Sequence, residues 1–231
     1  MALSRTQTVA ASQVNGDHTT NTKSITLVSG DNLIIARAEY NSFSGNRTMS
    51  MTWNGTAMTS LGNYTYNGTV NDEQEVFYLL TPDVGTYNCV LTMSGTVQTS
   101  VIQAVVYTDA DSVTAINQQT GSASPLSLTP SATTAADDII LSFVSIANAH
   151  TTVTATGSTS KLSNGINSGD YTGGNIGLFG LERTATGSGQ DNTATTDVDT
   201  FYAQTFTIKP SAGGGISIPV VMNQLRNQGI L

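Results

Sequence analysis

The chain has 231 residues, which is enough for one large all-β domain or two small ones. Charged residues make up only 10% of it, and the formal net charge is −8. The 8 Lys and Arg residues are too few to build a basic stripe, so we expect no nucleic-acid partner. An acidic membrane surface would repel this net charge, so we expect no membrane partner either.

Targeting signals are also missing from the sequence. No apolar run approaches the roughly 18 residues that a transmembrane helix needs. The first residues, MALSRTQTVAASQVNGDHTT, are polar and lack the apolar segment of a signal peptide. We therefore expect synthesis in a host cytoplasm without a signal peptide. The single cysteine, Cys89, excludes an intrachain disulfide.

Strand patterns follow one another along the chain, and helical periodicity is nearly absent. Residues 1–23 are too polar to fold alone, and we expect them to form an N-terminal arm. The strands that the pattern predicts in the first half lie at 24–28, 32–40, 48–61, 73–80, 87–94, 97–109 and 112–116. Those in the second half lie at 137–147, 150–158, 175–185 and 199–209.

Two organisations fit this series of strands. Asp31–Tyr40 and Asp137–Ile146 are alike, and residues 117–136 are rich in Ser, Thr and Pro, as a linker or a long surface connection would be. The likeness marks either two tandem Ig-like sandwiches or two central strands of one larger sandwich. We favour the second: an antiparallel jelly-roll-like β-sandwich over 24–210, flanked by terminal arms.

Several segments carry a family resemblance. The order DNLIIARAEY, MTWNGTAMTSLG, EVFYLLTPDVGTYNCVLTMSG, DDIILSFVSI and FYAQTFTIKP resembles jelly-roll β-sandwich modules of phage structural proteins and of bacterial surface or secreted proteins. Members often have Gly-Gly where this chain has Asn54-Gly55. The resemblance implies a structural β-sandwich and brings no catalytic residues with it.

The only tryptophan, Trp53, lies directly before Asn54-Gly55, a dipeptide typical of two-residue hairpins. In a type I′ turn Trp53 pairs with Thr56. Met49, Met51 and Met58 then share one face with the indole, and Ser50, Thr52 and Thr59 share the other. An apolar face of this kind predicts a core or a subunit interface rather than a sugar-stacking platform.

Residues that could carry chemistry are scattered. His18 and His150 are far apart, so we predict no metal site and no cofactor. Cys89 lies on the apolar face of its strand, which predicts a buried small hydrophobe rather than a nucleophile.

The clustered acidic residues are better explained by turn capping and edge protection than by catalysis or metal binding. The Asp-x-Asp pairs at 109–111 and 197–199 are typical of turn-capping acids, although such pairs can help to bind calcium. Asp72, Glu73 and Glu75 gather at a strand start, where charge usually protects a sheet edge. The sequence therefore predicts a protein that is not an enzyme.

The C-terminal segment, 211–231, combines a glycine-rich linker with a partly alternating apolar stretch. It is either packed on its own domain, added to the sheet edge of a neighbour or seated in a groove. The residues that we expect to contact a partner are Ile218, Pro219, Val220, Val221, Met222, Leu225, Arg226 and Leu231.

These observations predict a non-enzymatic virion structural protein on the capsid surface, a decoration or cement protein attached through its terminal arms. Its partners would be the major capsid protein and further copies of itself, for which a trimer would match the local symmetry. The alternative is a carbohydrate- or receptor-binding module of a phage tail, a fibre or a cell surface. Tyr64, Tyr66 and Tyr171, expected in loops, would then stack on the ligand.

Overall fold

The computed structural model describes residues 2–42, 44–67, 71–122, 124–147, 153–162, 176–196 and 200–211. They form sixteen strands, all paired antiparallel. The prediction of an all-β, antiparallel sandwich is confirmed. No helix among these residues is long and apolar enough to cross a membrane.

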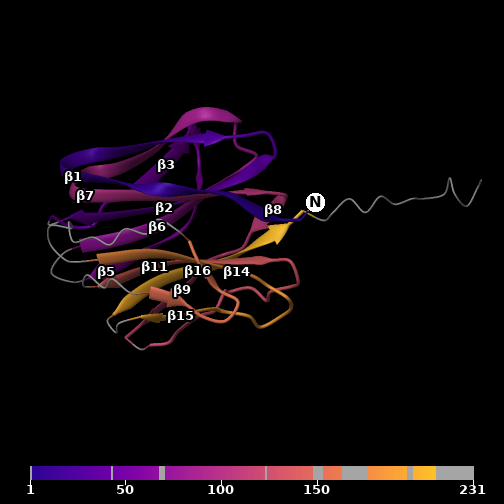
Figure 1. The fold of residues 1–231 in the computed structure, drawn as a ribbon. Coiled ribbons are helices and arrows are strands. Elements are labelled where there is room, and N and C mark those ends of the chain that lie inside the picture. Colours follow the sequence, from indigo (N-terminus) through magenta and orange to yellow (C-terminus); the bar gives the residue numbers. More distant parts are fainter. Residues whose placement is uncertain are drawn as a thin grey trace, which may run out of the picture.

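The strands belong to three sheets, which we name A, B and C (Figure 1). Sheet A contains β1 (Ser4–Leu27), β2 (Asp31–Ser42), β3 (Met49–Trp53), β4 (Thr56–Ala57), β5 (Thr59–Asn67), β6 (Asn71–Leu80) and β7 (Gly85–Thr108). Sheet B contains β8 (Ala110–Val113), β9 (Asn117–Gly121), β11 (Ile139–Ala147), β13 (Ser160–Lys161), β14 (Ile176–Thr184) and β16 (Phe201–Pro210). Sheet C contains β10 (Leu126–Leu128), β12 (Val153–Ala155) and β15 (Asn192–Thr196).

One pairing scheme occurs twice along the chain. In the first half β2 lies between β6 and β7, and in the second half β11 lies between β14 and β16. Three further pairs of the first half each have a counterpart in the second half. The pair β5–β6 corresponds to β13–β14, the pair β3–β7 to β12–β15, and the pair β1–β7 to β9–β16. The similar segments at 31–40 and 137–146 are thus the central strands of two different sheets.

The sheets form stacked layers with an apolar core at each contact (Figure 1). Leu33 and Ile35 of β2 pack against Leu141 and Phe143 of β11 in the core between sheets A and B. Val144 and Ile146, on the other face of β11, enter the core between sheets B and C. Because both faces of β2 and β11 are covered, these strands read as nearly continuous apolar runs in the sequence.

A third core lies inside sheet A, because this sheet bends over on itself. Strand β2 and hairpin β3–β4 belong to the same sheet, yet their side chains meet in one cluster. Trp53, fully buried, lies in this core. The cluster consists of Val9, Ile25, Leu27, Ile34, Ala36, Ala38, Tyr40, Met49, Met51, Trp53, Met58, Phe77, Cys89, Leu91, Met93, Val97, Ile102, Ala104 and Val106.

The hairpin at Asn54-Gly55 has the predicted geometry. Trp53 pairs with Thr56, and both turn residues have positive φ, 46° for Asn54 and 79° for Gly55, as a type I′ turn requires. Met58 N donates to Met51 O at 2.9 Å, so the predicted register continues past the turn. The prediction that Trp53 faces a core is confirmed.

Two expected segment boundaries differ in the structure. The residues expected in an N-terminal arm, 1–23, lie mostly in β1, which pairs with β7 along its whole length. They are ordered by backbone pairing, which does not require apolar side chains and so leaves no hydrophobic pattern. The expected connection at 117–136 contains β9 and β10, which pair with β16 and β15.

Candidate functional site

The most unusual group of side chains is a polar layer between sheets A and B. It consists of Arg37, Glu39, Gln74, Ser145 and Gln204, all at most 4% exposed. It continues the apolar core between these sheets, because Arg37 and Glu39 follow Leu33 and Ile35 on the same face of β2. The alternation of Arg37 and Glu39 in an otherwise apolar run was the sequence signal for it, and our sequence reasoning missed that signal.

Arg37 is held from both sheets. Its Nη1 donates to Val144 O of β11 at 3.2 Å and to Gln74 Oε1 of β6 at 3.5 Å. The guanidinium carbon lies 5.3 Å from the centre of the Phe143 ring. These contacts compensate in part for the removal of the charge from water.

A chain of hydrogen bonds fixes the direction of the amides in this layer. Gln204 Nε2 donates to Gly62 O at 2.9 Å, and Gln74 Nε2 donates to Gln204 Oε1 at 2.7 Å. A backbone carbonyl can only accept, so neither amide can be turned around. Gln74 Oε1 therefore faces the hydroxyl of Ser145, 2.6 Å away.

The surroundings of Glu39 favour its protonated form, and burial is the main cause. Ser145 Oγ lies 2.6 Å from Gln74 Oε1 and 2.7 Å from Glu39 Oε2, but it has one proton to donate. With an ionised Glu39, Ser145 can donate to only one of the two oxygens; a protonated Glu39 would satisfy both contacts, with Ser145 donating to Gln74 and Glu39 donating to Ser145. Burial raises the pKa of Glu39, although the Arg37 charge and the Ser145 hydrogen bond lower it.

Because the pKa of Glu39 is raised in the folded protein, we expect the free energy of unfolding to depend on pH. The unfolded carboxyl releases its proton near its ordinary pKa of 4.5, whereas the folded one keeps it, so the free energy of unfolding falls as pH rises above that value. Glu39→Gln has no proton to lose. Its stability relative to the natural chain should rise with pH by up to about 1.4 kcal/mol per pH unit.

Urea unfolding from about pH 4 to about pH 8 measures this difference. At the acid end the two proteins should be nearly equally stable, because protonated Glu and Gln are alike in shape and donors. A difference that does not change with pH would contradict a protonated Glu39.

A serine and a histidine lie close together inside sheet A. Ser100 Oγ is 2.7 Å from His18 Nε2, and His18 Nδ1 donates to Gly16 O. Asn21 Nδ2 donates to the same hydroxyl at 3.1 Å. Such a pair resembles an activated nucleophile, but Ser100 is 0% exposed. The group instead holds β1 to β7 where their register shifts between Asn15 and His18.

Glu73 and Glu75 do not protect an edge, so the expectation is wrong for these two acids. β6 lies between β2 and β5, and Glu73 and Glu75 are 4% and 8% exposed. Glu73 accepts from Tyr40 Oη at 2.9 Å, and Ser60 Oγ donates to Glu75. Burial is the main cause of the raised pKa of Glu75.

Two of the three tyrosines expected in loops are described by the structure, and both lie in a strand. Tyr64 and Tyr66 belong to β5, and the half-buried Tyr64 ring packs on Tyr202 with ring centres 5.3 Å apart. A ring already packed on a neighbour is a poor stacking platform for a sugar. Tyr171 lies outside the described residues.

Some of the remaining predicted residues are described by the structure, and others are not. Cys89 is fully buried in the core inside sheet A, as predicted, and burial raises the pKa of its thiol to about 12. The described residues contain no group of three or more His, Cys, Asp or Glu side chains that could hold a metal ion. His150, the acids at 197 and 199, and the tail residues Ile218, Pro219, Val220, Val221, Met222, Leu225, Arg226 and Leu231 lie outside the described residues.

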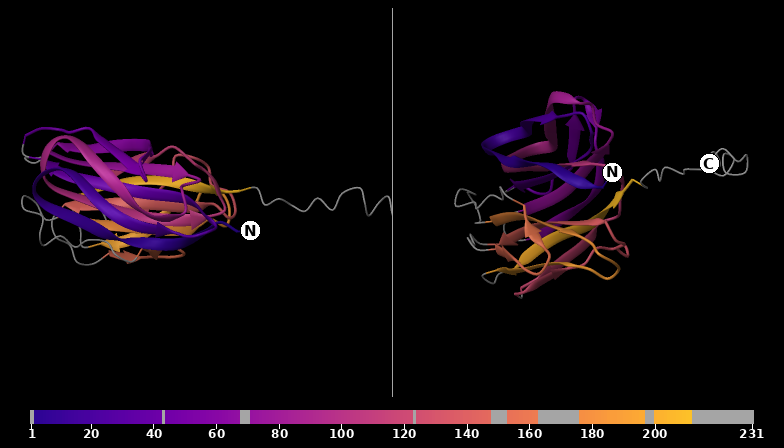
Figure 2. Two further views of the ribbon diagram at one scale, coloured as in Figure 1. Left: turned by 90° about the horizontal axis from the view of Figure 1, so that it is seen from above. Right: turned by 45° about the vertical axis from the view of Figure 1, so that its right-hand side comes forward.

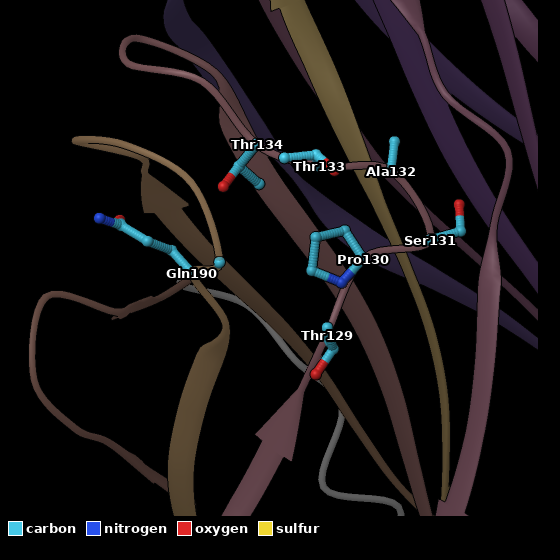
Figure 3. Close-up of a pocket in the computed structure, with 8 residues that line it drawn as sticks. Thr129, Pro130, Ser131, Ala132, Thr133, Thr134 and Gln190 are labelled. Atoms are coloured by element: carbon cyan, nitrogen blue, oxygen red, sulfur yellow. The ribbon is translucent and has the colours of Figure 1, made fainter.

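A shallow pocket of about 210 Å³ lies on the surface between the loop after β10 and the loop before β15 (Figure 3). Its walls carry the hydroxyls of Thr129, Ser131, Thr133 and Thr134, together with Pro130, and Gln190 lies across from them. None of the lining residues is charged. Such a pocket suits a small neutral polar ligand better than an anion or a metal ion.

β1, with 24 residues, has a long edge that pairs with no described strand, and we call it the free edge of β1. We use this name for the side of Ser4–Leu27 that faces away from β7, its only partner among the described residues. Ser211 N donates to Asp109 O at 2.7 Å, and the neighbouring Thr108 pairs with Ser4. The end of β16 and the start of β1 thus lie at the same end of the molecule (Figure 2).

Comparison of the chain with protein-family models, with curated proteins and with solved structures gave no match.

Proposed function

We propose that this protein is a non-enzymatic structural component of a virion, a decoration or cement protein on the surface of a phage capsid. The observation that carries the proposal is the free edge of β1, because an unpaired strand edge is a surface that other strands bind through backbone hydrogen bonds. The three stacked cores support it, since they make a rigid body for such an edge. The family resemblance points to the same class of protein.

Attachment would combine this sheet with the C-terminal tail. Each contact adds buried area between shell subunits, and the repetition of the contact over the shell multiplies a small gain. Low charge suits such a surface, because 10% charged residues leave few long side chains to immobilise on contact. The partners would be the major capsid protein and further copies of this chain, in an oligomer such as a trimer.

Rebinding to particles tests the proposal. Particles of the encoding phage, produced without this protein, are mixed with the purified chain and separated by sedimentation. We expect the chain to sediment with the capsids at a fixed, saturable number of copies. Binding to isolated tails alone, or no binding to either, would contradict a role on the capsid.

The second candidate is a carbohydrate-binding module, and the hydroxyl-lined pocket favours it. The exposed hydroxyls of Thr129 and Thr133 offer hydrogen bonds to a sugar, while those of Ser131 and Thr134 already donate to Ala115 O and Gly187 O. A glycan array with the natural chain and with Thr133→Val tests it. Binding that the substitution abolishes would support this candidate, and the absence of any bound glycan would reject it.

A further inference from the structure

Part of the free edge of β1, residues 6–16, lacks charged residues and prolines, two of the usual protections against strand pairing. Proteins protect long edges with charged side chains, prolines, bulges or a covering segment. Residues 6–16 of β1, TQTVAASQVNG, contain no charged residue and no proline. Bulges occur on either side of Gln7–Val9, but Ser12–Asn15 pairs regularly with β7. Within Ser12–Asn15 the Ser12 carbonyl already accepts from Asn21 Nδ2 at 3.2 Å, and no backbone partner other than β7 is described.

The tail begins next to this edge. Ser211 is hydrogen-bonded to Asp109, one residue from the Ser4–Thr108 pair that opens β1. Residues 212–215 contain three glycines, which permit a sharp change of direction, and they reach at most about 14 Å. The following residues, ISIPVV at 216–221, alternate in part and are rich in β-branched side chains. A strand formed by them would span about 20 Å.

We propose that residues 216–221 add to the free edge of β1 in the same chain, parallel to it, between Thr6 and Asn15. The short linker keeps the tail at a high effective concentration beside its own edge, so this arrangement is favoured over capture by another molecule. The proposal rests on the fold and not on the capsid role. It leaves the free edge of β1 beyond Asn15, together with residues 222–231, available for a partner.

Pro219 sets which side of the tail strand faces β1. Successive residues of a strand direct their backbone groups to opposite sides, and proline has no N–H to donate. Pro219 must therefore face away from β1, as an outermost strand allows. Ile218 and Val220 then direct their N–H groups to β1, whereas Ser217 and Val221 direct theirs to solvent.

This orientation gives a matched pair of variants. Val220→Pro removes an N–H that faces β1 and should release the tail. Val221→Pro makes the same change one residue later, on the solvent side, and should leave the tail in place. Neither residue belongs to a described strand, so both variants should keep the fold of the three sheets.

Amide hydrogen exchange measures the pairing directly. Between Thr6 and Asn15, every second amide of β1 faces away from β7. In the full chain these amides should exchange at least roughly ten times more slowly than in a chain that ends at Ser211. Val220→Pro should match the shortened chain, and Val221→Pro should match the full one. Amides of β2 should be the same in all four proteins, which verifies that each is folded.

The mass in solution is measured on the same samples by light scattering. Slow exchange in a monomer supports the proposal. Slow exchange only in a dimer would contradict pairing within one chain and indicate exchanged tails. Equal exchange of the β1 amides in the full and shortened chains would overturn the proposal. Neither result bears on capsid binding, which the rebinding experiment tests separately.

Discussion

Trp53→Ala should lower the free energy of unfolding by about 3–5 kcal/mol, one of the two largest effects that we expect from a single substitution. The indole is fully buried among the methionines of the core inside sheet A. It also packs edge-on against Tyr87, with ring centres 5.9 Å apart, and Nε1 donates to Asp83 O at 3.2 Å. Alanine would leave a cavity and an unpaired carbonyl at the adjacent turn.

Trp53→Phe is the matched control. It keeps most of the buried ring but loses the hydrogen bond to Asp83, so it should cost clearly less than alanine. Urea unfolding followed by circular dichroism measures both variants. Equal stability of Trp53→Ala and the natural chain would show that the indole is not in this core.

Phe143→Ala should have an effect of similar size, again about 3–5 kcal/mol. Phe143 lies in the core between sheets A and B. The centre of its ring is 6.2 Å from that of Phe206, and the Arg37 guanidinium lies over the ring. Its loss would open this core and remove the ring on which the buried charge rests. Phe143→Leu keeps most of the apolar volume and should cost about 1–2 kcal/mol.

The same variant tests whether the two halves of the chain unfold together. The only tryptophan lies in sheet A, while Phe143 lies in sheet B, so Trp53 fluorescence reports on the half without the substitution. The Arg5–Glu182 ion pair, at 3.2 Å, and the Tyr107–Glu182 hydrogen bond, at 2.6 Å, also join these sheets. We expect fluorescence and circular dichroism to shift to lower urea by the same amount. A fluorescence transition that does not move in Phe143→Ala would show two independent domains.

The fold class was predictable because apolar periodicity records which strands are buried on both faces. The runs at 32–40 and 137–147 are the central strands β2 and β11 of two sheets. The hairpin at Asn54-Gly55 was predictable too, since its two left-handed residues are a local requirement of the turn.

Pairing between distant strands was not predictable in the same way. β1 is ordered by backbone hydrogen bonds to partners between 58 (Leu27–Gly85) and 104 (Ser4–Thr108) positions away, and its own side chains are mostly polar. The local pattern of Glu73 and Glu75 predicts an edge, whereas β5 covers the other side of β6 and buries both acids. Such facts follow from tertiary arrangement, which a local pattern does not contain.

The polar layer between sheets A and B could not be predicted in full from the sequence. Arg37 and Glu39 are separated by one residue in the sequence, but their partners Gln74, Ser145 and Gln204 come from three other strands. Only the face-to-face packing of sheets A and B brings them together. The raised pKa of Glu39 comes mainly from its burial between the two sheets, which has no trace in the local sequence.

The thermal stability of particles tests the proposed role most directly. Purified particles with and without this protein are heated, and the temperature at which DNA is released is recorded for each. We expect complete particles to release DNA at a higher temperature, and the difference to return when the purified chain is added back. Release at the same temperature from both kinds of particle would contradict the role of a capsid cement.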